Sequence, residues 1–147
     1  MLQNGPAWFL LADGRRARLL TEPRRGAALD EAWSIEIGPE DLYDPQDRPP
    51  RSFDRVGAGR HAMDKGRNLR AAEEEKFLKR VAERVSEGEK HKAFDHLVIA
   101  APPRALGLLR NLLPAAAQSR IRAETPKDLL DEDAPKLRER LHELLRH

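Results

Sequence analysis

The stretch FDHLVIAAPPRALGLLRNLL, residues 94–113, joins a continuous apolar run to two prolines and then to a leucine-rich segment. An uninterrupted run such as LVIAA is typical of a strand that is buried on both faces, as strands of parallel sheets are. The prolines end the strand and suit the first turn of a helix. The leucines that follow recur at helical spacing. The stretch therefore predicts a buried strand, a tight turn and an amphipathic helix over residues 104–113.

The segments before and after this unit predict a sheet with helices around it. The runs AWFLLA and ARLLTE flank Asp13-Gly14, a dipeptide that suits the positive φ angles of a tight hairpin turn. Further strands are expected at residues 34–38 and 119–124, and further helices at 69–87, ending before Gly88, and at 134–145, with Asp133 as N-cap. An opening hairpin followed by alternating strands and helices predicts an α/β fold with a mixed β-sheet and flanking helices.

The composition is typical of a single domain in a reducing compartment. The chain has 147 residues, of which 39% are hydrophobic and 35% charged, enough apolar material for one core. We therefore expect one domain over residues 1–147. The absence of cysteine excludes disulfides, thiolate catalysis and cysteine zinc sites. No apolar run approaches the roughly 18 residues that cross a bilayer, and the first residues lack the pattern of a secretory signal, so the expected location is the cytoplasm.

The net charge is only +2, but the charges are segregated along the chain. Residues 30–47 contain seven acidic side chains and no basic one, whereas residues 48–70 contain seven basic side chains and two acidic ones. Prolines and glycines interrupt every regular pattern between about residues 45 and 68, which predicts a long basic loop. Two interpretations stay open: the loop binds a polyanion, or it is simply solvated or paired with the acidic stretch.

The glycines and basic residues of this loop are those that a polyphosphate would use. Glycine lets backbone N–H groups approach an anion, and arginine offers forked donors that match phosphate oxygens. A histidine beside a phosphate can bind it or carry a proton. The expected binding residues are Arg55, Gly57, Gly59, Arg60, His61, Lys65 and Arg67. These residues predict contact with RNA or another polyanion. The sequence predicts no cofactor.

Catalytic chemistry has weaker candidates. Asp13, at the end of the first strand, and Glu36 are the carboxylates that a two-metal site of the ribonuclease-H type would use, but no third partner is apparent. Asp-Gly is foremost a turn dipeptide. The five histidines share no metal-ligand spacing, and none stands in a nucleophile motif. The sequence therefore predicts no metal site, and it favours a binding role over an enzymatic one.

The order of several motifs resembles the bacterial host attachment protein family, whose members are described as required for attachment to host cells. The motifs are WFLLADGRRARLL, RPPRSFDRVGAGRHAMD, EEEKFLKRVAERV, FDHLVIAAPPRALGLLRNLL and ETPKDLL, and together they span nearly the whole chain. The AxGRHAMD and LVIAAPPxxLGxLR segments are the most specific. That family is similar to the central domain of archaeal and eukaryotic peptide-chain release factors, which implies an α/β domain related in shape to the ribonuclease-H fold.

The release-factor resemblance also implies a role for the basic loop. In those factors the corresponding loop carries Gly-Gly-Gln, enters the peptidyl-transferase centre and helps to position water for ester hydrolysis. This chain has GAGRH, residues 57–61, at that place, and no glutamine follows. The resemblance therefore does not carry hydrolytic activity over to this chain, but it does imply that the loop approaches ribosomal RNA.

Three functions stay open as alternatives. The first is a non-catalytic cytoplasmic binding module that associates with RNA or the ribosome through the basic loop. The second, implied by the family name, is a factor that attaches to the host-cell surface, which would require exposure outside the cell. The third is a hydrolase that acts on peptidyl-tRNA through His61 and Arg60 or on nucleic acid through Asp13. We expect the first, with RNA or the ribosome as the partner.

Overall fold

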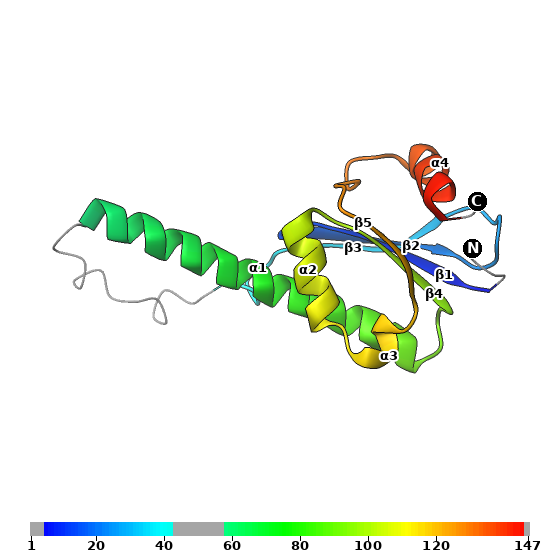
Figure 1. The fold of residues 1–147 in the computed structure, drawn as a ribbon, viewed down its shortest axis with the longest axis horizontal. Coiled ribbons are helices and arrows are strands. Elements are labelled where there is room, and N and C mark those ends of the chain that lie inside the picture. Colours follow the sequence, from blue (N-terminus) through cyan, green and yellow to red (C-terminus); the bar gives the residue numbers. More distant parts are fainter. Residues whose placement is uncertain (1–4, 43–57, 146–147) are drawn as a thin grey trace.

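The computed structural model describes residues 5–42 and 58–145 of the chain (Figure 1). Within these residues the chain forms five strands and four helices. In chain order they are β1 (Ala7–Ala12), β2 (Arg16–Glu22), β3 (Asp30–Glu36), α1 (Ala58–Lys90), β4 (His96–Ala100), α2 (Pro103–Leu112), α3 (Ala115–Gln118), β5 (Ile121–Thr125) and α4 (Ala134–Leu145). The α/β fold class expected from the sequence is confirmed.

The five strands form one mixed sheet in the order β3-β2-β1-β4-β5. β1 pairs antiparallel with β2 and parallel with β4, so the opening hairpin and the buried strand meet at the centre. β4 also pairs parallel with β5, and all of its residues are buried. The continuous apolar run of β4 follows from this position, because the strand has a neighbour on each side and a core on each face.

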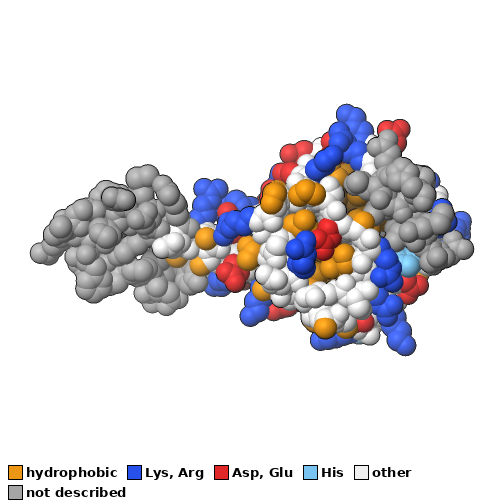
Figure 2. All heavy atoms as spheres, viewed as in Figure 1, with side chains coloured by type: hydrophobic (Ala, Val, Ile, Leu, Met, Phe, Trp, Pro, Cys, Tyr) orange, Lys and Arg blue, Asp and Glu red, His pale blue; other side chains and the backbone are white. Residues whose placement is uncertain are grey.

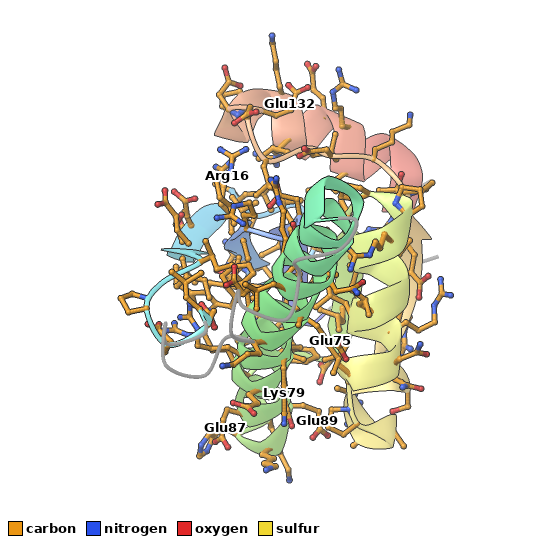
Figure 3. All side chains as sticks on the ribbon, turned by 90° about the vertical axis from the view of Figure 1, so that its left-hand side faces the viewer. Arg16, Glu75, Lys79, Glu87, Glu89 and Glu132 are labelled. Atoms are coloured by element: carbon orange, nitrogen blue, oxygen red, sulfur yellow. The ribbon has the colours of Figure 1, made fainter. Side chains whose placement is uncertain are left out.

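Helices cover both faces of the sheet, so the fold has three layers. Figure 3 shows α1 and α2 on one side of the sheet and α4 on the other. Under α1 and α2 the core contains Leu10, Phe77 and Leu109. Under α4 it contains Phe9 and Leu137. Adjacent residues of β1 serve different cores because side chains alternate along a strand.

The edge strand β3 begins earlier than the strand expected at residues 34–38. It spans Asp30–Glu36, and all its side chains are exposed or half-buried. The alternation of SIEIG indicated the strand. The acidic residues ahead of it do not alternate with apolar ones, so the sequence pattern did not extend the strand back to Asp30. Charged side chains are common on edge strands because they discourage pairing with another chain.

The helix α1 is much longer than the helix expected at residues 69–87. It contains 33 residues, which corresponds to about 50 Å at 1.5 Å per residue. Residues 58–68, expected in the basic loop, are helical, so the loop expectation is corrected for this part of the chain. The rest of the expected loop, up to residue 57, lies outside the described residues.

The later turns of α1 pack on the sheet, and its first turns extend beyond the sheet (Figure 1). Phe77, Leu78 and Val81 are fully buried. The apolar stripe that predicts a helix from sequence appears only where a helix meets a core. This explains why the pattern did not mark the true start of α1.

Gly88 lies inside α1 and does not end it, contrary to expectation. A Cβ atom at this position would lie 2.2 Å from Cη2 of Trp8, far inside van der Waals contact. The ring of Trp8 is also held against Phe94, with ring centroids 4.7 Å apart. Glycine is therefore required here by the approach of an indole ring.

The end of α1 is closed by backbone hydrogen bonds around Lys92. The N–H of Ala93 donates to the carbonyl of Gly88 at 2.8 Å, and the N–H of Lys92 donates to that of Glu89 at 3.0 Å. This pattern places one residue in the left-handed region, usually glycine. Lys92 occupies it, with φ of 56°.

The hairpin of β1 and β2 is confirmed, but its turn is not the expected one. Gly14 does not have a positive φ angle. Instead, Oδ1 of Asp13 accepts hydrogen bonds from the N–H groups of Arg15 at 2.7 Å and Arg16 at 2.8 Å. The missing side chain of Gly14 leaves space for Glu74 of α1, whose Oε2 would lie 2.7 Å from a Cβ atom there.

The C-terminal half of the chain follows the expected order closely. The helix α4 has the expected bounds, and Oδ1 of Asp133 accepts the N–H of Lys136 at 3.0 Å, which confirms the N-cap. Among the elements of the described residues, the four-residue α3 has no sequence prediction, because it is too short to show a helical period. None of the helices in the described residues is long and apolar enough to cross a membrane.

Candidate functional site

The expected binding residues fall in and around the start of α1. Gly59, Arg60, His61, Lys65 and Arg67 lie on the first turns of this helix, whereas Arg55 and Gly57 lie outside the described residues. Figure 1 shows this end of α1 extending away from the sheet. The helix therefore carries the five positions away from the body of the protein.

The start of α1 has a composition that does not favour a helix. Its first turn contains no acidic residue, and residues 58–70 carry four basic side chains against one acidic one. Acidic side chains are the ones that stabilise the positive end of the helix dipole, and glycines at 59 and 66 lower the helix propensity further. A segment that departs from several local rules is expected to owe its composition to function.

Three of the five described acidic residues of the acidic stretch pair with arginines outside the basic segment. Nε of Arg18 lies 2.6 Å from Oε1 of Glu31. Arg80 binds Asp41 at 2.6 Å and Glu40 at 3.1 Å. These three carboxylates are thus paired with arginines that lie outside the basic segment. These three carboxylates therefore do not support the interpretation in which the acidic stretch neutralises the basic segment.

Arg80 links α1 to the segment that follows β3. Its guanidinium donates to both carboxylate oxygens of Asp41, at 3.1 and 2.6 Å, and to the carbonyl of Glu36 at 3.0 Å. Asp41 is only 2% exposed and also accepts the N–H of Gly38. Burial alone would raise the pKa of Asp41, but the hydrogen bonds from Arg80 and Gly38 outweigh it, so the pKa lies below its ordinary value. Asp41 therefore stays ionised and fixes the middle of α1 to the edge of the sheet.

A second group of ion pairs lies where α1 leaves the sheet. Glu74 is 16% exposed and binds Nη1 of Arg104, at the start of α2, through Oε2 at 2.9 Å. Nε of Arg70 approaches its other oxygen at 3.5 Å. Both arginines are largely exposed, so water screens these pairs and they add little to stability. The pair with Arg104 crosses to α2, whereas Arg70 and Glu74 stand one turn apart within α1. The Arg104 and Arg80 contacts thus link α1 to other elements at two places along its length.

The described surface of the body has no comparable excess of positive charge on the face seen in Figure 2. Acidic and basic side chains are interspersed there, including where α1 joins the body. Figure 3 shows the same mixture along α1, where Glu75, Lys79, Glu87 and Glu89 follow one another. In the sequence, by contrast, residues 58–70 contain four basic residues and one acidic one.

A small pocket lies beside Glu74, at the edge where the parallel strands end. It has a volume of about 160 Å³ and is lined by Gly14, Glu74, Leu78, Pro102, Arg104, Ala105 and Leu108. Ligands of α/β proteins commonly bind at this edge. Here the walls are mainly apolar, and the one carboxylate is already paired with arginines. Sequence reasoning missed the pocket because only the fold brings the hairpin, α1 and α2 together.

The candidate catalytic residues are not brought together by the fold. Asp13 holds the hairpin turn, as the Asp-Gly dipeptide predicts. Glu36 stands on β3, which β2 separates from β1. Across residues 5–42 and 58–145, no group of three His, Cys, Asp or Glu side chains is placed to hold a metal ion. Asp13 therefore has a structural role in the turn.

Comparison with known families gives one match that covers most of the chain. A family model described as "Protein required for attachment to host cells" matches residues 8–141. This is the family that the order of sequence motifs indicated. No curated protein matches the sequence.

Among solved structures, the chain is similar to the archaeal translation termination factor aRF1. The TM-score is 0.50 and the sequence identity is 12%, with 81% of this chain covered. The chain corresponds to only 29% of the length of that factor. At this identity the likeness shows a shared fold, which confirms the release-factor-like architecture expected from the sequence.

Proposed function

The chain belongs to the family of proteins required for attachment to host cells, and we propose that it acts as a non-catalytic RNA-binding module in the cytoplasm. The proposed partner is the ribosome. The proposed contact is the basic start of α1, with cations at Arg60, His61, Lys65 and Arg67 and close backbone approach at Gly59. Arg55 and Gly57, just ahead of the helix, complete the proposed set.

The observation that carries this proposal is a helix end that projects from the body (Figure 1) and whose residues 58–70 include four basic side chains and one acidic one. The positive end of the helix dipole points outward where the side chains are already basic, which favours an anionic partner. RNA carries one phosphate per nucleotide, so several cations spaced along a helix end can meet several phosphates at once. The anchors at Glu74 and Arg80 support the helix from the body.

The shared fold is a reason to test ribosomes before other RNAs. The similar archaeal protein is a translation termination factor. Because the chain shares its fold with part of that factor, translation is the first setting in which to test the proposed contact. The chain lacks the Gly-Gly-Gln motif of release factors, so the proposal includes binding and no hydrolysis.

The family description is compatible with a role inside the cell. "Required for attachment" states a dependence of attachment on the protein. A protein that acts on translation meets that description if it controls the synthesis of surface components. The protein then need not touch the host itself.

Co-sedimentation with ribosomes over a series of salt concentrations tests this function. The logarithm of the binding constant should fall with the logarithm of the salt concentration, at about −0.7 per phosphate contact on single-stranded RNA. Replacing Arg60, Lys65 and Arg67 together by glutamine should weaken binding and reduce the steepness of this line by about 2.

A matched control removes the same charge from elsewhere. Lys90, Lys127 and Lys136 are all exposed and lie outside the start of α1. Their replacement by glutamine should leave both the affinity and the salt dependence nearly unchanged. If both triple variants lose the same affinity, the interaction depends on net charge alone and the proposed contact is wrong. If the wild type does not associate with ribosomes even at low salt, the proposal is rejected.

Direct attachment to the host is the second candidate, favoured by the family description. It requires the protein to be exposed on the cell surface. Protease treatment of intact cells should then release peptides of this protein while a cytosolic marker stays protected. If the protein stays as protected as the marker, direct attachment is excluded.

A further inference from the structure

His96, the first residue of β4, has no hydrogen-bond partner for its ring. The side chain is 5% exposed, and both Nδ1 and Nε2 are buried and unpaired. Leu97 and Ile99 belong to the core under α1. Because side chains alternate along a strand, His96 lies on the other face of the sheet, as Val98 does.

An unpaired buried imidazole needs an explanation. A neutral imidazole carries one N–H donor and one acceptor nitrogen, and both lose their bonds to water on burial. An apolar side chain would fill this position without that loss. Buried polar groups that lack protein partners are commonly bonded to an ordered water or to a ligand.

Arg120 presents a second unpaired nitrogen at the same corner of the sheet. Its Nε is buried and has no partner. Its carbonyl accepts the N–H of Leu97 at 2.8 Å, and Leu97 is paired with Ile121. Arg120 and His96 therefore stand side by side, each one residue ahead of a paired position.

We propose that His96 and Arg120 form a binding site for a small oxyanion at the amino edge of β4 and β5. A phosphate or carboxylate group supplies the acceptor oxygens that Nε of Arg120 and the imidazole N–H of His96 lack. The site lies at the opposite end of the sheet from the projecting end of α1 (Figure 1). It is therefore independent of the proposed RNA contact and does not depend on that function.

Ring nitrogen chemical shifts of the full chain, followed by NMR at fixed pH, test this site. The probes are inorganic phosphate and acetate, each compared with sodium chloride at the same ionic strength. The shifts of His96 should change in a saturable way with at least one of the two oxyanions and not with chloride. His91, which is 78% exposed at the end of α1, serves as the internal reference and should show no saturation.

A conservative variant separates this site from general effects of salt. Arg120→Lys keeps the positive charge but removes Nε, and it should weaken the oxyanion at least about tenfold. The thermal midpoint should rise with the same oxyanion in the wild type, and this rise should disappear in His96→Gln. A His96 ring that responds to neither oxyanion is paired with water only and overturns the proposal. Equal affinity in the wild type and Arg120→Lys would also overturn it.

Discussion

Replacing Gly88 by alanine should destabilise the protein, although glycine-to-alanine changes inside helices normally do the opposite. The new Cβ atom would lie 2.2 Å from Cη2 and 2.5 Å from Cζ3 of Trp8. Carbon atoms prefer separations of about 3.5 Å or more, so the indole ring must move by about 1 Å. Phe94 lies against the ring and limits this movement.

The expected size follows from two opposing effects. Overpacking of a core costs about 1–3 kcal/mol, and the higher helix propensity of alanine returns about 1 kcal/mol. Trp8 is only half-buried, so part of the strain can relax outward. We expect a net loss of about 1 kcal/mol, the middle of the range of about 0–2 kcal/mol that the two effects leave, or a fall of about 3 °C in the thermal midpoint for a chain of this length.

Two control variants make this prediction sharp, with urea denaturation as the assay. Gly107, inside α2, has no other atom within 4 Å of the place that a Cβ atom would take, so Gly107→Ala should stabilise the protein by about 0.5–1 kcal/mol. In a Trp8→Ala background, Gly88→Ala should also become stabilising. If Gly88→Ala stabilises the wild type as much as Gly107→Ala does, the packing of Trp8 on α1 is not as described.

Three further predictions concern the ends and anchors of α1. Arg80→Gln leaves Asp41 buried without its cation and should cost about 2 kcal/mol at neutral pH. The pKa of Asp41 is lowered in the folded protein, so the contribution of this pair is present above the ordinary value of 3.8 and is lost as the pH falls through the lowered value; denaturation curves of wild type and variant should therefore converge in acid. Lys92→Gly relieves the left-handed φ of 56° and should stabilise the protein by about 0.5–1 kcal/mol in a thermal scan. Gly14→Ala would place a Cβ atom 2.7 Å from Oε2, 2.8 Å from Cδ and 3.0 Å from Cγ of Glu74. Because this side chain can rotate away, the change should cost less than about 1 kcal/mol by urea denaturation; a larger loss would show that the side chain cannot move aside.

The parts of the fold that follow from burial could be predicted from sequence. β4 and α2 were predicted because their apolar residues follow the period of a strand or helix that meets a core. The start of β3 was missed because an edge strand buries little and carries charges instead. The first turns of α1 were missed for the same reason: they extend beyond the sheet, so no apolar stripe indicates a helix there.

The roles of individual glycines and acids depended on partners far away in sequence. Gly88 looked like a helix end, yet its role is set by Trp8, eighty residues earlier in the chain. Asp41 was one acid among seven in its stretch, and only the fold places Arg80 beside it. The unpaired ring of His96 likewise had no signal in sequence, because an apolar run containing one histidine is typical of an ordinary strand.

The most direct test of the central claim is site-specific photo-crosslinking in living cells. A photoreactive residue at position 65, near the start of α1, is compared with the same residue at position 136, an exposed site on α4. The account predicts adducts with ribosomal RNA from position 65 and none above background from position 136. Equal yields from the two positions, or no RNA adduct from position 65, would contradict it.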